Sequence, residues 1–161
     1  MNDTSILRGK HILLVDDEPD VLETLTELLD MCEIDTAPNF EFAARLIGES
    51  DYDMAVFDIM GVRGYDLLEL ANQKGLPALM FTAHALNPDD FVKSIEGGAK
   101  AYIPKEKMPE IATYIADLLK DKEGTHRHGT WYAKLKPYFD KKFGPEWKEH
   151  YKHFWEKFEL D

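Results

Sequence analysis

Short apolar runs alternate with stretches of helical periodicity along the first 120 residues of the chain. Each run is followed by polar residues, which is typical of a strand buried on both faces. The runs span residues 11–15, 34–37, 52–57, 76–81 and 101–103. After each run, apolar residues recur three or four positions apart, as on one face of a helix, within 21–29, 42–47, 67–71, 91–95 and 111–119. This alternation predicts an α/β fold, in which helices cover both faces of a five-stranded parallel sheet.

Local signals mark the ends of two predicted helices. Asn87 before Pro88 is typical of a helix start, because an Asn side chain caps free backbone amides and Pro suits the first helical position. The glycine pair at 97–98 is expected to end that helix. In the same way, Gly144 and Pro145 predict a break between two helical segments near the C-terminus.

Charge and aromatic content change sharply near residue 121. Residues 1–120 hold 23 acidic and 10 basic side chains, whereas residues 121–161 hold 8 and 9. All three Trp and 10 of the 19 aromatic residues lie in the last 41 residues. We therefore expect a domain over 1–120, a linker over 121–129 and an aromatic helical tail over 130–161. The negative charge of the first domain would repel a nucleic acid backbone.

Aromatic side chains in the tail recur at helical spacing. The first segment carries Trp131, Leu135, Tyr138 and Phe139. The second carries Trp147, Tyr151, Phe154 and Phe158, with Trp155 beside them, and predicts one helix with an aromatic stripe. Such an apolar stripe packs against something, and both the first domain and a second copy of the chain stay open as its partner. The tail is too short for a helix-turn-helix output, so no nucleic acid partner is expected.

Composition excludes several classes of protein. Apolar residues make up 44% and charged residues 31% of the chain, which is typical of a sequence that buries a core. No apolar run approaches the roughly 18 residues of a membrane span, and the start lacks a secretory signal, so we expect a soluble cytoplasmic protein. Cys32 is the only cysteine, which excludes an internal disulfide and a cysteine metal site.

Polar residues follow the predicted strands at the points where those strands end. Asp16 and Asp17 follow the first strand, Asp58 the third, Thr82 the fourth and Lys105 the fifth. Because the carboxyl ends of parallel strands meet at one edge of a sheet, we expect these side chains to lie close together. Taken singly, each has an ordinary structural explanation, such as a helix N-terminus or a solvated loop, and only their coincidence points to a site.

The chemistry of this set favours a phosphate site. Converging carboxylates repel one another unless a cation neutralises them, and oxygen ligands of this kind select a hard ion such as Mg2+. A carboxylate beside that ion can attack phosphorus and form an aspartyl phosphate. A lysine and a hydroxyl would then offset the charge of the new phosphoryl oxygens.

Residues 8–120 resemble a receiver domain of the bacterial response-regulator family. The matching features are VDDE at 15–18, FD at 57–58, FTA at 81–83 and GGAKAYIPK at 97–105, in this order and spacing. The resemblance implies a flavodoxin-like, doubly wound sheet of strand order 2-1-3-4-5, with the C-terminal helices as an extension.

The resemblance also implies a role for each site residue. The phosphoacceptor would be Asp58, the Mg2+ ligands Asp16, Asp17, Asp58 and the backbone carbonyl of Met60, the phosphate-contacting lysine Lys105, and the switch pair Thr82 and Tyr102. Two departures stand out. Val62 replaces a proline common in the family, so the loop after Asp58 is expected to be more mobile. Glu106 rather than proline follows Lys105, which makes the fifth strand-to-helix turn harder to predict and a cis bond there unfavourable.

By this resemblance, the chain would accept a phosphoryl group from a sensor histidine kinase or a phosphotransfer protein and signal through contacts with an unidentified downstream protein. It would not be an enzyme beyond its own phosphorylation and dephosphorylation. A homodimer would form through the tail or through the fourth and fifth helices. Two alternatives are a small Mg-dependent phosphohydrolase, disfavoured because Met60 stands where a second acid is needed, and a constitutive assembly module with a vestigial acidic site.

Overall fold

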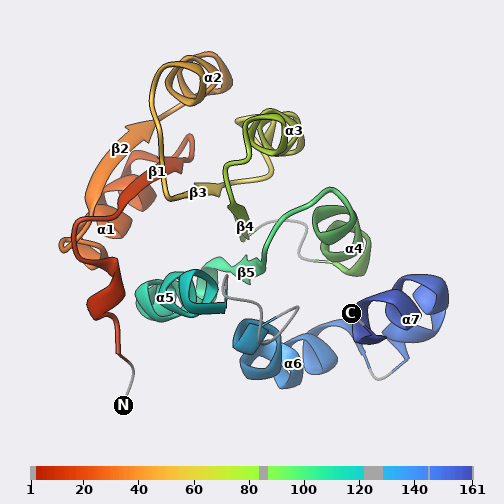
Figure 1. Cartoon of the computed structure of the whole chain (residues 1–161). Helices are drawn as coiled ribbons and strands as arrows, with labels where there is room; N and C mark the ends of the chain where they lie inside the picture. Colours follow the sequence, from red (N-terminus) through yellow and green to blue (C-terminus); the bar gives the residue numbers. More distant parts are fainter. Residues whose placement is uncertain (1–2, 84–86, 122–128, 145, 161) are drawn as a thin grey trace.

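The computed structural model describes residues 3–83, 87–121, 129–144 and 146–160. A five-stranded parallel sheet in the order β2-β1-β3-β4-β5 forms its centre (Figure 1). The strands are β1 (His11–Val15), β2 (Glu33–Ala37), β3 (Met54–Phe57), β4 (Ala78–Thr82) and β5 (Tyr102–Pro104). The predicted fold class and strand order are confirmed.

Helices cover both faces of the sheet, as a doubly wound fold requires. The helices of this part are α1 (Pro19–Leu28), α2 (Phe40–Glu49), α3 (Gly64–Lys74), α4 (Pro88–Glu96) and α5 (Ile111–Asp121). Helices α1 and α5 lie on one face, and α2, α3 and α4 on the other (Figure 1). A 3-10 turn, η1 (Ser5–Leu7), precedes β1.

Burial explains why the central strands are continuous apolar runs. Every residue of β3 and β4 is buried, as are four of the five residues of β1, because helices pack on both sides of these strands. Strand β2 lies at the edge of the sheet, and Glu33 and Thr36 there are exposed. The third and fourth strands begin two residues later than predicted. Leu76 is buried before the fourth strand begins, so its burial marks packing rather than strand pairing.

The predicted ends of α4 are confirmed. The Asn87 side chain accepts a hydrogen bond from the Asp90 amide at 2.9 Å, and Pro88 is the first helical residue. The helix ends at Glu96, followed by Gly97. After β5 the chain forms a 3-10 helix, η2 (Lys105–Glu110), before α5 begins. All peptide bonds of the described residues are trans, including the one after Lys105.

The C-terminal tail forms α6 (Gly129–Phe143), a 3-10 helix η3 (Trp147–Tyr151) and α7 (Lys152–Leu160). The break after Phe143 is where the sequence predicts it, with Gly144 at a left-handed φ of 93°. The single helix predicted over 147–158 is wrong, because its first five residues form η3. A 3-10 helix has three residues per turn, so a spacing of four does not keep side chains on one face. Trp147, Trp155 and Phe158 are therefore the buried residues of the segment, and the other two stripe residues are half-buried.

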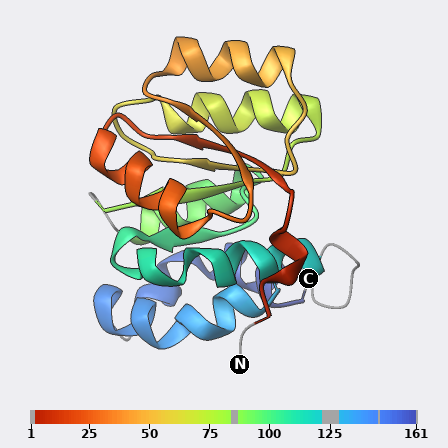
Figure 2. The ribbon, with the colours of Figure 1, turned by 90° about the vertical axis from the view of Figure 1, so that its left-hand side faces the viewer.

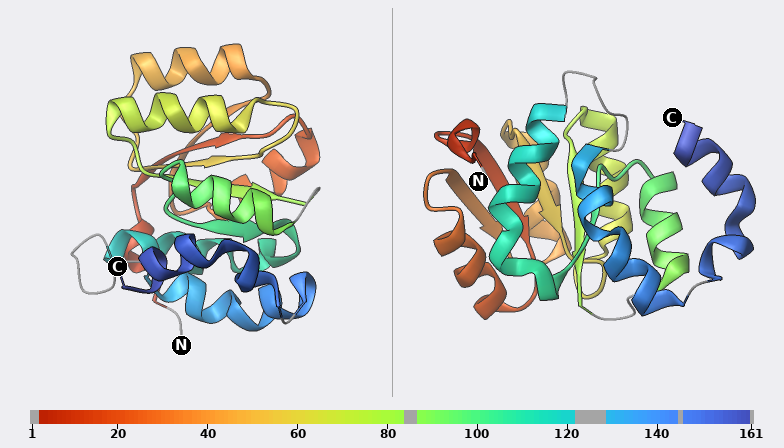
Figure 3. Two further views of the ribbon diagram at one scale, coloured as in Figure 1. Left: turned by 90° about the vertical axis from the view of Figure 1, so that its right-hand side faces the viewer. Right: turned by 90° about the horizontal axis from the view of Figure 1, so that it is seen from below.

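The tail packs against the rest of the same chain. Helix α6 runs beside α5, at the end of the molecule opposite α2 (Figure 2). Seen from below, α6 lies between α5 and α4, and α7 lies on the far side of α4 (Figure 3). Of the two partners left open by the sequence, the described tail contacts its own first domain. The predicted linker lies almost wholly outside the described residues, so the domain limits stay a prediction.

Candidate phosphorylation site

Four predicted site residues come together at the carboxyl edge of the sheet. Asp16 follows β1, Asp58 follows β3 and Lys105 follows β5, while Thr82 is the last residue of β4. The Lys105 Nζ lies 2.7 Å from Asp16 Oδ2 and donates a hydrogen bond to Asp58 Oδ2 at 3.3 Å. Lys105 therefore joins the two carboxylates that the first and third strands deliver.

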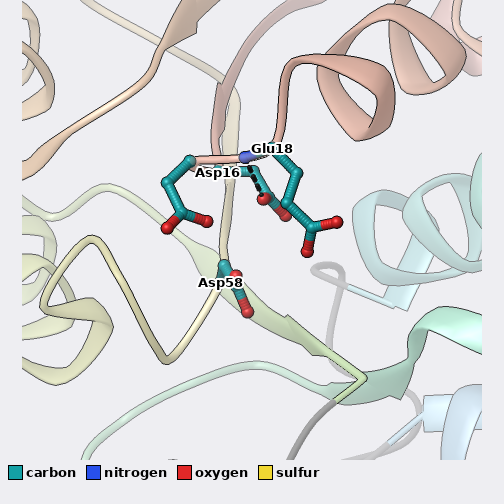
Figure 4. Close-up of side chains that lie close together, drawn as sticks. Asp16, Glu18 and Asp58 are labelled. Atoms are coloured by element: carbon teal, nitrogen blue, oxygen red, sulfur yellow. Dashed lines mark hydrogen bonds between the residues drawn. The ribbon is translucent and has the colours of Figure 1, made fainter.

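The centre of the site is shielded from water. Asp16, Asp58 and Lys105 are 2%, 6% and 9% exposed, whereas the neighbouring Asp17 and Glu18 are exposed. Figure 4 shows Asp16 and Glu18 on the turn between β1 and α1, with Asp58 below them. One carboxylate oxygen from each of Asp16, Asp17, Glu18 and Asp58 lies within 4.8 Å of the others. The site therefore has a buried floor and an exposed acidic rim.

Glu18 belongs to the site as well, although the sequence did not predict it there. Its Oε1 lies 3.5 Å from Lys105 Nζ, and its carboxylate belongs to the acidic cluster. The signal was available in the third acidic residue of VDDE. In the structure Glu18 is also the residue that precedes α1, with Pro19 at the first helical position.

Backbone amides hold both buried carboxylates in place. Asp16 Oδ1 accepts a hydrogen bond from the Glu18 amide at 2.9 Å, and Asp58 Oδ1 accepts one from the Ile59 amide at 2.9 Å. The Asp58 amide in turn donates to the Val15 carbonyl at 3.0 Å, which ties β3 to the end of β1. Each carboxylate thus keeps its second oxygen for Lys105.

The electrostatics show a shortage of positive charge. Burial, reinforced by the charge of Asp16, raises the pKa of Asp58 to about 6, although Lys105 opposes the shift. Burial acts to lower the pKa of Lys105, but its hydrogen bond to Asp16 and the charges of both carboxylates outweigh this, and the pKa is raised. One ammonium thus faces four clustered carboxylates, an arrangement that an added cation would stabilise.

The donor set suits a hard divalent ion. All candidate ligand atoms in the cluster are oxygens, which Mg2+ prefers. The loop after Asp58 comes up against Asp17, since a Cβ at Gly61 would lie 2.2 Å from Asp17 Oδ2. Gly61 also has a φ of 81°, a left-handed value that glycine adopts without strain. Glycine is therefore favoured here both by its missing side chain and by its backbone conformation. Met60, whose backbone carbonyl is the expected fourth ligand, directly precedes it.

The rest of this loop has packing partners that the sequence did not reveal. Val62, at the position of the missing proline, is fully buried. A Cβ at Gly64 would lie 2.2 Å from the Asp58 carbonyl oxygen, so the loop crosses its own start at close range. Arg63 has a left-handed φ of 57° and places its guanidinium 4.0 Å from the centre of the Phe40 ring. Close contacts therefore explain why Gly61 and Gly64 are glycines, in addition to the loop mobility expected from the sequence.

The two predicted switch residues are both buried. Thr82 is fully buried and lies opposite Pro104 in the register of β4 and β5. Pro104 directly precedes Lys105 in the sequence. Tyr102 is also fully buried, with its ring centre 5.5 Å from that of Phe91 and 6.1 Å from that of Phe139. The contact between Tyr102 and Phe139 of the tail was not predicted from the sequence.

The strand order and the acidic cluster at the carboxyl edge of the sheet are those of a flavodoxin-like α/β signalling module. The sequence pattern of the response regulator receiver domain matches residues 12–116, and the chain belongs to this family. Receiver domains of two-component response regulators are signalling modules rather than enzymes in the usual sense, and they generally bind Mg2+ at an acidic pocket. Helices α6 and α7 lie beyond the matched residues.

Individual relatives support the assignment. The chain is 32% identical over 103 residues to the two-component response regulator ARR18 of Arabidopsis thaliana, across 60% of this chain and 16% of that protein. It is 33% identical over 106 residues to the DNA-binding response regulator MtrA of Mycolicibacterium smegmatis, across 63% of this chain and 46% of that one. The chain thus spans less than half the length of these relatives.

A solved structure gives the same fold. The CheY-like response regulator receiver domain protein of Methanospirillum hungatei superposes with a TM-score of 0.65 at 27% identity. The match covers 99% of that protein and 73% of this chain. Among the described residues, no helix is both long and apolar enough to cross a bilayer.

Proposed function

We propose that the chain is a phosphorylation-controlled receiver that accepts a phosphoryl group on Asp58. The observation that carries this proposal is the pairing of Asp58 with Lys105 and Asp16 on the buried floor of an acidic site. Asp58 combines three properties that a phosphoacceptor needs. It lies in a cluster of oxygen ligands, it contacts a lysine, and a backbone amide fixes one of its oxygens.

In the proposed reaction, an Asp58 carboxylate oxygen attacks the phosphorus atom of a phosphohistidine donor. The new O–P bond forms as the N–P bond breaks, and the electron pair of that bond returns to the imidazole nitrogen. Asp16, Asp17, Asp58 and the Met60 carbonyl would hold Mg2+, which supplies positive charge next to the phosphoryl oxygens when bound. Lys105 is close enough to contact a phosphoryl oxygen on Asp58 after a small shift from its present partners.

The phosphorylated state would be read out through Thr82 and Tyr102. The Thr82 hydroxyl would donate a hydrogen bond to a phosphoryl oxygen, and the Tyr102 ring would be favoured in a buried position behind it. These two movements change the face made by α4, β5 and α5, so a local charge change reaches a protein surface. The full burial of Thr82 and Tyr102 on adjacent strands supports this pairing.

The partners follow from the chemistry. Response regulators receive their phosphoryl group from histidine kinases or phosphotransfer proteins, and we propose the same class of donor for this chain, acting in the cytoplasm. The MtrA relative is described as DNA-binding, but the matched part of this chain is the receiver. The net charge of -12 of this chain favours a protein rather than a nucleic acid as the downstream partner. Neither a phosphohydrolase nor a vestigial module gains support, since the side chain of Met60 supplies no second acid and the site residues are all present.

The test is labelling of the full chain with acetyl phosphate and Mg2+. We expect Asp58→Asn to abolish the acid-labile label found by intact mass. Asp51→Asn is the matched control, because Asp51 is a fully exposed carboxylate three residues before β3, at the opposite end of that strand from Asp58. Equal labelling of the Asp58→Asn variant and the unmodified protein would refute the assignment.

A further inference from the structure

The tail covers the last edge of the sheet and the helix next to it. Strand β5 ends the strand order, and α6 lies beyond it between α4 and α5 (Figure 3). Trp131, Leu135 and Phe139 of α6 are fully buried or nearly so, as are Trp155 and Phe158 of α7. The tail is thus an integral layer of the molecule.

Phe91 of α4 is the centre of this contact. Its ring is fully buried, and the centres of the surrounding rings lie 5.0 to 6.3 Å away. These rings belong to Tyr102, Trp131, Tyr132, Phe139, Trp147, Phe154, Trp155 and Phe158. All of them except Tyr102 come from the tail. Tyr102 is therefore part of the tail interface as well as of β5.

One short segment, residues 102–107, holds both the site and the tail. Lys105 contacts Asp16 and Asp58. On either side of Lys105, the segment contacts α6. The Tyr102 ring packs on Phe139, Glu106 Oε1 lies 3.6 Å from Lys142 Nζ, and Lys107 Nζ lies 5.5 Å from the centre of the Tyr138 ring. A movement of Lys105 would therefore be transmitted to residues that hold α6.

The tail interface also contains features that weaken it. The indole nitrogens of Trp131 and Trp155 are buried without a hydrogen-bond partner among the described residues. A buried donor without a partner lowers the stability of the interface that buries it. Ion pairs act in the opposite direction and hold the tail. For example, Lys134 Nζ of α6 lies 2.6 Å from Asp117 Oδ2 of α5. The unpartnered donors therefore offset part of the stability that burial of the rings and the ion pairs give to the docked tail.

We propose that the tail helices α6, η3 and α7 are a built-in effector of the phosphorylation site, so that their docking and the phosphoryl group on Asp58 favour each other through residues 102–107. This proposal rests on the proposed function. With the tail docked, Phe139 and Phe91 hold the Tyr102 ring in its buried place, which is the position that phosphorylation would favour. Because coupling between two binding events is reciprocal, phosphorylation must tighten the tail to the same degree.

The direct test is hydrogen exchange of the full chain with and without beryllofluoride and Mg2+, the beryllofluoride serving as a phosphoryl analogue. We expect the amides of α6 and α7 to exchange at least about five-fold more slowly when the analogue is bound. Unchanged or faster exchange would overturn the proposal. Acetyl phosphate labelling separates this failure from failure of the proposed function: a protein labelled on Asp58 whose tail protection does not rise refutes only the coupling.

Three variants test whether the coupling passes through residues 102–107. Phe139→Leu removes the ring contact with Tyr102, and we expect the effect of the analogue on α7 exchange to fall to less than about two-fold. Lys142→Ala, a milder surface change, should reduce the effect in the same direction. Lys134→Ala is its matched control, because it also breaks an ion pair of α6 but leaves residues 102–107 untouched. An equal loss in the Lys134→Ala and Lys142→Ala variants would mean that the coupling does not pass through that segment.

Discussion

The acidic site and the aromatic cluster around Phe91 are two buried centres built on opposite principles. The site consists of charged side chains whose positions depend on backbone hydrogen bonds and on Lys105 as a shared partner. The cluster consists of rings from α4, β5 and the tail, and the indole nitrogens of Trp131 and Trp155 have no hydrogen-bond partner among the described residues. The site is short of positive charge and gains from a ligand, whereas the cluster is stabilised mainly by the burial of its rings.

The acidic site and the aromatic cluster contribute differently to the stability of the fold and to its chemistry. Carboxylates packed together make a site that is ready to bind a cation and a phosphoryl group, but their repulsion destabilises the fold. Rings packed together stabilise the fold but carry no chemistry. Residues 102–107 touch both centres, so changes in one centre can be measured in the other.

The largest expected effect is the loss of the ring at the centre of the cluster. Phe91→Ala should lower the free energy of unfolding by about 3 to 5 kcal/mol, because a buried ring is removed and the surrounding rings cannot all close the gap. Denaturant unfolding measures this change. Phe42→Ala is the control, since Phe42 on α2 is 39% exposed and its loss should cost less than about 1 kcal/mol. Similar losses in both variants would show that the cluster does not stabilise the fold.

A substitution in the site should have the opposite sign. Asp58→Asn is expected to raise the free energy of unfolding by about 1 to 3 kcal/mol at pH 7 without Mg2+, because it removes a buried charge. Asp51→Asn, at an exposed carboxylate, should leave the stability unchanged. If Asp58→Asn destabilises the protein, the site is not short of positive charge.

The pH dependence of this effect follows from the raised pKa of Asp58, about 6 against an ordinary value of 3.8. The folded state binds this proton more tightly than the unfolded chain. The stability that protonated Asp58 contributes is therefore present below about pH 4 and is lost as the pH rises through about 6. The difference between the unmodified protein and Asp58→Asn should vanish at the acid end of that window and be largest above it.

The smallest of the three effects concerns the exposed rim of the site. Asp17→Asn should weaken Mg2+ binding by about ten-fold, because one charge is lost from a cluster of hard oxygen ligands. Calorimetric titration of both proteins measures the affinities. Asp20→Asn is a suitable control, since Asp20 is an exposed carboxylate in the first turn of α1 and does not belong to the cluster. Equal affinity of Asp17→Asn and the unmodified protein would remove Asp17 from the metal site.

Most of the fold was predictable because its signals are local. The capping of α4 by Asn87 and Pro88, and the end of α6 at Phe143, depend on residues adjacent in sequence. The site was predictable for a different reason: parallel strands deliver their carboxyl ends to one edge, so Asp16, Asp58 and Lys105 had to meet. Glu18 was missed because its role depends on the distance to Lys105, which no local pattern encodes.

By itself, the sequence determined the five strand-helix repeats, the set of carboxylates with their lysine, and the need of the tail aromatic residues for burial. Periodicity and charge along the chain are sufficient for these, because each depends on the chemistry of neighbouring residues. Only the tertiary structure decided what the tail covers, that Phe91 lies at the centre of its rings, and that Tyr102 and Glu106 contact α6. A ring at helical spacing must be buried, but the surface that buries it is chosen by shape and free energy across the whole fold.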